Sequence, residues 1–443
     1  MAPRLHDKGN HGAWLVIAFA FLLSCTGAFF SSQGDLASSR LATVYSLTTH
    51  HTWYIDQPDN RFAGETIDRV VVRGTEENGI MRGGRMISSK PPVMPLVMTG
   101  IYVIAHPITG WGLESSHDID RLLVLMTILL VSCSFLVTLV FFLKTLSLFE
   151  LQYKAELYLI MALALGTQVA GYSITINNHV PAAGALMLAI YLALGLIFDK
   201  HAPSIWRFLL FGFAGALVPT IDMPAGIYIA ALGCALLAKF PKHTLLWSVC
   251  GGALPLLVHF GATYAVTGSF LPVQMRDATY MYESAYWRHP LGIDALSEPK
   301  LVYLFHTTFG RCGVFLLFPV LILGLIGFVM GARSTSKPMR RLTVGCLACF
   351  LVLVAYYVKS THNYGGESYG FRWYIASMPV LLLVAIPVVT RISTRWQWGI
   401  ALLLLAVSMY STFESAYVGW ESGREWTSRV FGRAYEQVNP DPR

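Results

Sequence analysis

The chain has 443 residues, of which 55% are hydrophobic and only 13% are charged, and its mean hydropathy is +0.54. A soluble domain carries about 25% charged residues, so this composition excludes one soluble core and predicts a polytopic membrane protein. The formal net charge is +7, but Lys and Arg are scattered between apolar runs, which argues against nucleic acid as a partner and assigns the charge to membrane topology.

The seven cysteines show no sign of a metal or redox site. Almost all of them fall inside apolar runs, and their spacing matches neither a zinc motif nor a redox pair. We expect them to pack as small hydrophobic side chains. They are Cys25, Cys133, Cys234, Cys250, Cys312, Cys346 and Cys349.

The chain starts with a short polar segment and a first apolar run. Residues 1–12 are polar and include Arg4 and Lys8, and an apolar run follows over about 13–30. A signal peptide has this pattern, but no clear small-x-small cleavage site follows and a polytopic body does. We therefore expect an uncleaved first transmembrane helix within residues 1–31 and a cytoplasmic amino terminus.

A long polar stretch, residues 34–92, separates this helix from the next apolar segment. That segment, residues 93–104, is bounded by His106-Pro107, and at about 1.5 Å per residue it is too short for a bilayer core of about 30 Å. We expect a juxtamembrane or half-inserted helix there. Residues 32–120 then form one external loop that carries the chemistry, with short helices near each end.

Further apolar runs of spanning length follow, which makes about eleven transmembrane helices in total. If residues 93–104 do not span, every strongly basic short loop lies on the side of the amino terminus, as the positive-inside rule requires. The helix bundle, residues 121–413, then places its loop 267–311 and the short tail 414–443 outside. The predicted spans are roughly 121–143, 155–176, 180–198, 205–221, 224–238, 245–266, 312–332, 342–358, 373–390 and 396–413.

Asp35 stands where the first helix leaves the membrane, before an amphipathic run that includes Arg40. In this place it fits a helix N-cap that is favourably placed in the helix dipole. It also fits a carboxylate at the lipid boundary, where partial desolvation would tune it as a general base for a hydroxyl or amine acceptor. One residue can fill both roles.

Lys90 precedes two prolines in the sequence SSKPP. Pro-Pro fixes an extended backbone and pushes the preceding residue out of the helical region, so the ammonium group is presented instead of folded back on a helix. An ammonium at the interface suits an anionic lipid phosphate. The alternative is a lysine that only snorkels at the membrane edge.

Two short polar sites interrupt the apolar runs farther along the chain. Asn177-Asn178-His179 lies in a tight turn, where asparagine is expected as a cap and a lone histidine is a weak argument for metal ligation. Asp222 is an acid between two apolar runs. Such an acid is either a functional residue at membrane depth or a residue at a loop tip, and both alternatives stay open.

Residues 279–294, TYMYESAYWRHPLGID, gather aromatic side chains beside Arg288 and His289. Aromatic belts at membrane interfaces explain the tyrosines and the tryptophan. The same lining beside an arginine also suits contact with a sugar or a prenyl chain.

The second strong polar stretch is THNYGGESYGFRWY, residues 361–374. Its glycines, Gly365, Gly366 and Gly370, permit a close approach of the backbone. Arg372 stands where the next span begins, where it can form two hydrogen bonds with a phosphate. Because an arginine at a helix start faces the unfavourable end of the helix dipole, we expect a bound anion or an acidic partner there.

Together these features resemble the GT-C membrane glycosyltransferases, and within them the bacterial group related to protein O-mannosyltransferases and to the aminoarabinose transferase of lipid A, which is glycosyltransferase family 39-like. The resemblance rests on GD after the first helix, an arginine five residues on, SSKPP, and the NYGG and YGFRW stretch, and it covers the chain to about residue 390. It implies an all-α polytopic membrane protein with a GT-C-like bundle and a large first external loop. The sequence holds no P-loop, Rossmann fingerprint, HExxH or GxSxG motif.

The resemblance also implies an activity: transfer of a sugar from a polyprenyl-phosphate donor to a hydroxyl or amine acceptor on a glycan, lipid or protein. On this carry-over Asp35 is the base, supported by Arg40, while Lys90 and Arg372 hold the donor phosphate. A lipid donor explains why no nucleotide-binding motif is present, and phosphate departure needs fixed cations, not necessarily a metal. The protein is expected in a bacterial inner membrane, with its active site facing the periplasm or exterior.

The sequence departs from the family pattern in two respects. Many relatives carry two acids in the first loop, whereas here Asp35 stands alone and the second acid is left open. No large soluble domain follows the bundle, so the acceptor is left open, and no metal ligand set is evident although a divalent metal also stays open. The further candidates for substrate binding are Asp56, Asp68, His179, Asp222, Arg288, His289, Asn363, Tyr364 and Glu367, and Asp56, Asp68 and Asp222 are the alternatives for the second acid.

A secondary transporter or lipid flippase is the alternative function, and a non-catalytic scaffold is a third. A transporter is expected to carry intramembrane charges, broken midplane helices and inverted repeats. The predicted spans here are nearly free of charge, and the charged residues collect at one face. The sequence therefore favours the glycosyltransferase.

Overall fold

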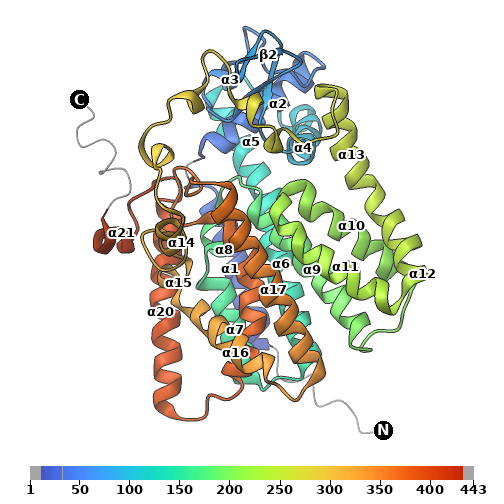
Figure 1. Ribbon diagram of the computed structural model, residues 1–443, viewed down its shortest axis with the longest axis vertical. Coiled ribbons are helices and arrows are strands. Elements are labelled where there is room, and N and C mark those ends of the chain that lie inside the picture. The colour runs from blue at the N-terminus through green and yellow to red at the C-terminus, as the bar shows by residue number, and fades with distance from the viewer. Residues whose placement is uncertain (1–10, 32, 433–443) are drawn as a thin grey trace.

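The computed structural model describes residues 11–31 and 33–432, and of Asp35 and Leu36 it describes the backbone alone. Figure 1 shows a tall bundle of helices with a smaller cap at one end, where α2, α3, α4 and the strands gather. The predicted cytoplasmic segment with Arg4 and Lys8, and the last eleven residues of the predicted tail, lie outside the described residues.

The bundle consists of helices, several of which are interrupted by a short 3-10 or π turn. The α-helices are α1 His11–Gly27, α2 Asp35–Thr49, α3 Arg61–Gly64, α4 Val93–Thr109, α5 Ser116–Met126, α6 Cys133–Leu146, α7 Tyr153–Leu165, α8 Gln168–Gly171, α9 His179–Ile197, α10 Ile205–Ile221, α11 Gly226–Lys239, α12 Pro241–His243, α13 Val249–Thr267, α14 Lys300–Thr308, α15 Val314–Leu317, α16 Ile322–Ala332, α17 Lys337–Ser360, α18 Met378–Val384, α19 Ile386–Val389, α20 Arg395–Tyr417 and α21 Trp426–Phe431.

Among residues 11–31 and 33–432, six helices are long and apolar enough to cross a membrane, and one bent pair makes a seventh candidate. Five shorter apolar helices accompany them. Each predicted span overlaps one of these helices, which confirms the all-α polytopic fold. The six are Ser116–Phe149, His179–Ile197, Pro241–Thr267, Lys337–Ser360, Arg372–Val389 and Arg395–Tyr417, the bent pair is Tyr153–Leu165 with Gln168–Ile174, and the shorter ones are His11–Gly27, Val93–Thr109, Ile205–Ile221, Met223–Lys239 and Pro319–Ala332.

The helix α4 is longer than the sequence predicts. It continues from Val93 through Pro107 to Thr109, so the predicted end at His106-Pro107 is wrong. A proline in the last turn costs a single hydrogen bond before the helix stops, and Gly110 closes the helix in the left-handed conformation at φ 73°. The helix packs against α2 in the cap.

The predicted span 312–332 is also interrupted. Helix α16 begins only at Ile322. The residues before it form the short helix α15 and a 3-10 turn that starts at Pro319. Proline lacks a backbone N–H and fixes φ, so it starts a new helical segment more readily than it continues one.

The cap contains two small antiparallel β-ribbons between α3 and α4, which the sequence analysis did not foresee. Strand β1 (Arg69–Val72) pairs with β4 (Arg85–Ser88), and β2 (Thr75–Glu77) pairs with β3 (Ile80–Arg82). The register sets Arg69 opposite Ser88. Asp68, directly before β1, is therefore brought close to Ser89 and Lys90, the two residues after β4, and the Ser89 N–H donates to the Asp68 carbonyl at 3.0 Å.

The helix α9 lies at the centre of the bundle and is buried along nearly its whole length. It packs against α6, α10 and α11, and glycines permit close approach: a Cβ on Gly184 of α9 would lie 2.7 Å from the Ser134 carbonyl oxygen of α6. In lipid no hydrophobic effect drives helices together, so small residues at such crossings stabilise the bundle by permitting close van der Waals packing. The start of α9 is thereby held rigidly below the cap.

The loop 267–311 joins the cap to the bundle. It consists of short 3-10 turns and α14, and the Met81 N–H in the cap donates a hydrogen bond of 2.6 Å to the Met281 carbonyl. The segment after α20 contacts the loop that follows α17, where the Tyr369 N–H donates to the Gly419 carbonyl at 3.0 Å. The cap, this loop and the segment after α20 thus converge on one end of the bundle.

Candidate active site

The β1–β4 ladder brings Asp68 and Lys90 together. Asp68 precedes β1 and Lys90 follows β4, and the Lys90 Nζ lies 2.8 Å from the Asp68 Oδ1, with each side chain 17% exposed. The Ser39 hydroxyl of α2 donates to the Asp68 carbonyl at 2.7 Å and is hydrogen-bonded to the Ser88 hydroxyl at 2.7 Å. The ion pair is therefore fixed by backbone register and by α2.

Arg40 lies on the buried face of α2. It is 0% exposed, and its Nη2 donates to the Asn178 Oδ1 of the turn before α9 at 3.4 Å. Burial lowers the pKa of Arg40 to about 10, which the charge of Asp68 opposes and that of Arg372 reinforces. Arg40 thus remains a cation at neutral pH.

Arg372 directly follows the glycine-rich loop, residues 361–371, which joins α17 to it. Gly365 and Gly366 adopt φ of 96° and 72°, which glycine adopts without strain, and a Cβ on Gly365 would lie 3.4 Å from the Arg372 Cγ. The guanidinium carbon lies 5.2 Å from the centre of the Trp420 ring, a cation–π distance. The buried Nε of Arg372 makes no hydrogen bond with any residue that the structure describes.

Three cations from separate segments therefore share one site. Burial lowers the pKa of Lys90, and the charges of Arg40 and Arg372 lower it further, while Asp68 raises it. Cations that repel one another in a partly buried site favour the binding of an anion. The charge of Asp68 acts on all three cations, and the charges of Asp222 and Asp294 also act on Arg372.

His179 and Asp222 form a buried pair beside these cations. The His179 Nδ1 lies 2.7 Å from the Asp222 Oδ2, and the side chains are only 6% and 5% exposed. Arg372 and Arg40 lie close enough to the His179 ring to interact with it electrostatically. An ionised Asp222 accepts the Nδ1 hydrogen of a neutral ring, which leaves the Nε2 atom as a proton acceptor.

Asn177 has the structural role that the sequence predicts for this turn. Its side-chain oxygen accepts the Val180 N–H at 2.9 Å, and its amide donates to the Tyr172 and Thr175 carbonyls, both at 2.8 Å. Asn177 therefore shapes the turn that presents Asn178 and His179.

Asn363 organises the glycine-rich loop and ties it to Asp294. Its side-chain oxygen accepts the N–H groups of Gly365 and Gly366, both at 2.6 Å, and its amide donates to Asp294. Burial raises the pKa of Asp294, as does the charge of Glu367. Sequence reasoning missed Asp294, although the residue closes the aromatic segment 279–294.

A small pocket that is partly open to the surroundings lies beside Lys90, between the cap, α4 and α13. Its lining includes the polar side chains of Ser88, Lys90 and Gln274, and most of its other lining side chains are apolar. A cation beside apolar side chains suits an amphipathic molecule with an anionic head. The other lining residues are Thr43, Trp53, Ile87, Pro92, Pro95, Ala262, Thr263, Val266, Thr267 and Val273.

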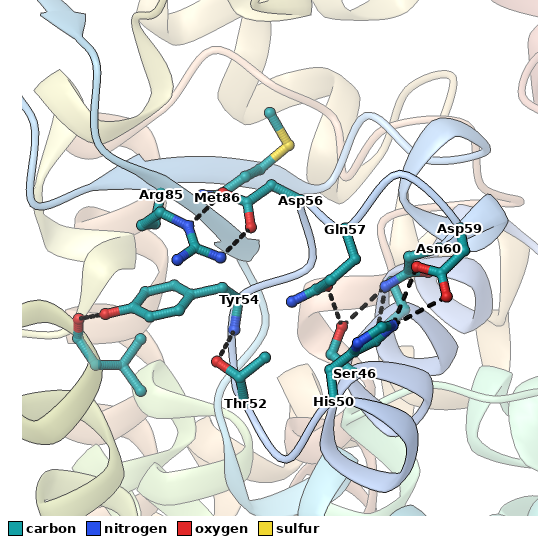
Figure 2. Close-up of polar contacts among 12 residues, drawn as sticks. Ser46, His50, Thr52, Tyr54, Asp56, Gln57, Asp59, Asn60, Arg85 and Met86 are labelled. Carbon is teal, nitrogen blue, oxygen red and sulfur yellow. Dashed lines mark hydrogen bonds and ion pairs between the residues drawn. The ribbon is translucent and has the colours of Figure 1, made fainter.

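Asp56 lies apart from this cluster, in the cap. Its carboxylate accepts two hydrogen bonds of 2.8 Å from the Arg85 guanidinium and one of 3.1 Å from the Met86 N–H. Figure 2 shows this arrangement beside a second group in which Asp59 contacts His50. The contacts of Asp56 hold the loop before α3 to β4.

The remaining predicted residues occupy different places. Arg288 and His289 are exposed, and Arg288 donates to the Glu283 carbonyl at 3.0 Å. Tyr364 is buried and donates its hydroxyl to Glu298. Glu367 accepts the Ser422 N–H at 3.2 Å. Tyr364 and Glu367 thus anchor the glycine-rich loop to its surroundings.

Asp35 is the first residue of α2, and the N-cap position belongs to Gly34. The predicted capping role of Asp35 is therefore wrong by one position, although an acid in the first turn still faces the favourable end of the helix dipole. The side chain of Asp35 lies outside the part of the chain that the structure describes, so its predicted role as the base stays a prediction.

Within the described part of the chain, no group of three His, Cys, Asp or Glu side chains lies close enough to hold a metal ion. The described side chains therefore form no ligand set of the kind found in structural or catalytic metal sites.

Glu425 supports the glycine-rich loop and makes a pH-dependent contribution. It is 0% exposed, and it accepts the Gly370 N–H at 2.8 Å and the Ser428 hydroxyl at 3.0 Å. Burial raises the pKa of Glu425 to about 7. The folded protein then binds more protons than the unfolded chain between about pH 4.3 and 7, so this contribution falls as the pH rises through that window.

We expect Glu425→Gln to flatten the decrease in thermal midpoint between pH 5 and 8, by roughly 1.4 kcal/mol of unfolding free energy for each pKa unit lost. Thermal unfolding of wild type and variant across this range measures the effect. The exposed Glu421, changed to Gln, is the matched control. Equal slopes for wild type and Glu425→Gln would contradict the assignment.

No protein-family model matches the sequence, and no curated protein matches it. Solved structures do match the fold. ArnT from Cupriavidus metallidurans in the apo state aligns with a TM-score of 0.53 at 14% identity, over 88% of this chain and 61% of that one. The same protein bound to undecaprenyl phosphate aligns with a TM-score of 0.51 at 13% identity, over 90% and 64%.

An oligosaccharyltransferase from Archaeoglobus fulgidus, in complex with Zn and sulfate, aligns with a TM-score of 0.49 at 15% identity, over 92% of this chain and 54% of that one. The chain thus spans about three fifths of the ArnT structures that it matches. The ArnT alignments confirm the GT-C fold that the sequence motifs indicate. Together with the apolar helices they identify an integral, multi-pass membrane protein.

Proposed function

We propose that this GT-C chain is a membrane glycosyltransferase that moves a sugar from a polyprenyl-phosphate donor to a hydroxyl or amine acceptor on a glycan, lipid or protein. The reaction takes place under the cap, which we assign to the external face of a bacterial inner membrane. The observation that carries this proposal is the convergence of Arg40, Lys90 and Arg372 on a site with Asp68 as their shared acid.

The donor phosphate is the ligand that suits this convergence. Lys90 and Arg372 bind its oxygens, and Arg40 supports them from the buried face of α2. An arginine fork and a lysine point charge are the usual partners of a phosphate. The cavity beside Lys90 has apolar walls from α4 and α13, which suit the start of a prenyl chain.

The reaction exchanges one bond for another. The acceptor oxygen or nitrogen forms a bond to the anomeric carbon while the bond from that carbon to the phosphate oxygen breaks, and the electron pair leaves with the phosphate. Negative charge grows on the phosphate, where fixed cations stabilise it. The proton of the acceptor passes to Asp35, the proposed base.

The acids and the histidine around the cations have supporting roles. Asp68 holds Lys90 in place, and Asp222 orients the His179 ring. The Asp294–Asn363 contact shapes the loop that carries Arg372. We assign His179 to substrate binding at the sugar end of the donor, because it lies beside the phosphate cations, whereas Asn363 acts through the loop that carries Arg372.

Asp68→Asn tests the charge balance of the site. We expect a lower thermal midpoint than in wild type, because the cations lose their compensating acid, and loss of one partner of a buried pair costs about 3–5 kcal/mol at most. Undecaprenyl phosphate should then raise the midpoint more in the variant than in wild type, since its phosphate replaces the lost charge. Thermal unfolding in detergent with and without this lipid measures both effects.

The exposed acid Glu76 of the cap, changed to Gln, is the control for this experiment, and it should behave as wild type. Equal shifts on lipid addition in wild type and Asp68→Asn would show that the phosphate binds elsewhere.

The proposed activity is tested by transfer of labelled sugar from polyprenyl-phosphate donors in proteoliposomes. Wild type should consume the donor and release polyprenyl phosphate, and Lys90→Ala at matched expression should lose most of this turnover. Arg82→Ala is a control, because Arg82 is an exposed arginine of the cap that pairs with Glu77 at 3.2 Å. If no donor is bound or consumed while a solute or lipid crosses the bilayer, the transferase proposal fails.

A further inference from the structure

A second, larger cavity lies in the half of the bundle away from the cap, between α9, α11, α17 and α18, and is partly open to the surroundings. In Figure 1, α9, α11 and α17 lie below the cap, and α11 packs against both α9 and α17. We call it the lower groove. Its walls include Ile190, Leu194, Ile197, Tyr228, Leu232, Leu342, Gly345, Cys346, Cys349, Val380 and Leu383.

The lower groove is apolar and has unfilled space. A Cβ placed on Gly345 of α17 would meet no heavy atom within 4 Å. The Tyr228 hydroxyl in the wall donates to the Ser377 hydroxyl at 2.9 Å and so needs no further partner. An apolar cavity whose polar groups are satisfied holds hydrocarbon in preference to water.

The mouth of the lower groove carries a surplus positive charge. Lys239 lies 2.6 Å from the Asp199 carboxylate and donates to the Ile197 carbonyl at 2.8 Å, so its charge is compensated. Arg341 also lines the groove and is exposed. The ion pairs within 4.0 Å among the described residues do not include Arg341, so this guanidinium is available for an anion.

We propose that the lower groove binds an anionic glycerophospholipid, with an acyl chain between α11 and α17 and the phosphate on Arg341. Charge decides the headgroup, because an anionic lipid adds its net negative charge beside Arg341 whereas a zwitterionic lipid brings a cation of its own. Basic pockets between transmembrane helices bind anionic headgroups in this way. This binding is independent of the proposed transferase activity.

The test uses the full-length protein, purified in detergent and stripped of lipid. Native mass spectrometry and thermal unfolding are recorded with phosphatidylglycerol and, separately, phosphatidylcholine. We expect phosphatidylglycerol to be retained and to raise the thermal midpoint, with an affinity about tenfold higher than that of phosphatidylcholine, the size of one charge-assisted hydrogen bond.

Two pairs of variants localise the effect. Gly345→Leu places a side chain in the groove, while Gly233→Leu adds the same side chain to α11 at another position with open space. Arg341→Gln removes the surplus charge, while Arg340→Gln removes its exposed neighbour. The first member of each pair should lose the preference for phosphatidylglycerol, and the second should keep it.

Three results would overturn the proposal. They are equal retention of the two phospholipids, an unchanged preference in both Gly345→Leu and Arg341→Gln, or displacement of phosphatidylglycerol by equimolar undecaprenyl phosphate in the lower groove. Sugar transfer is measured in parallel, so a failure of lipid binding is told apart from a failure of the proposed activity.

Discussion

Arg372→Gln is expected to reduce kcat/KM for the polyprenyl-phosphate donor by about 10²–10³-fold, the usual loss when one group that stabilises a developing anion is removed. The reason is that Arg372 has a buried Nε without a described partner and lies over Trp420 on a loop of positive-φ glycines. A cation held in this way is poised for a ligand and contributes little to folding. The thermal midpoint without donor should therefore stay the same or rise.

Arg372→Lys separates charge from geometry. The lysine restores the positive charge but not the two-pronged hydrogen bonding, so we expect partial recovery of activity only. Arg288→Gln is the matched control, since Arg288 is exposed and donates to a backbone carbonyl. Full activity of Arg372→Gln with normal donor affinity would remove Arg372 from the phosphate site.

Asp35→Asn is expected to lower kcat by about 10²–10⁴-fold, the contribution typical of a general base. Donor binding should be nearly unchanged, because the base acts on the acceptor proton and not on the phosphate. Steady-state transfer in proteoliposomes gives kcat, and thermal shift with undecaprenyl phosphate reports donor binding. Asp59→Asn serves as control, since Asp59 is an exposed cap acid bonded to Tyr45 and His50.

His179→Asn provides the contrasting variant. The His179–Asp222 pair places a second proton acceptor beside the cations. If Asp35→Asn keeps its turnover while His179→Asn and Asp222→Asn lose theirs by the same factor, the base is the histidine. Non-additive losses in the double variant of His179 and Asp222 would then show that the two side chains act as one unit.

The partners of the predicted site residues are mostly distant in sequence, and the sequence analysis assigned few of them. It named Lys90 and Asp68 separately, yet their contact depends on the antiparallel register of β1 and β4. It left Asp222 open between membrane depth and a loop tip, and the structure pairs it with His179, 43 residues away. It grouped Asp56 with these acids, whereas Asp56 binds Arg85.

The sequence by itself determined the membrane class, the positions of the apolar helices and the three motifs that indicate the GT-C fold. These are local properties, because hydrophobic length and proline or glycine placement act over neighbouring residues. Tertiary structure decided which charges meet: Arg40 from α2, Lys90 from the β-ribbon and Arg372 from the glycine-rich loop. Their proximity depends on strand register and helix packing, which are set by contacts between segments far apart in the chain.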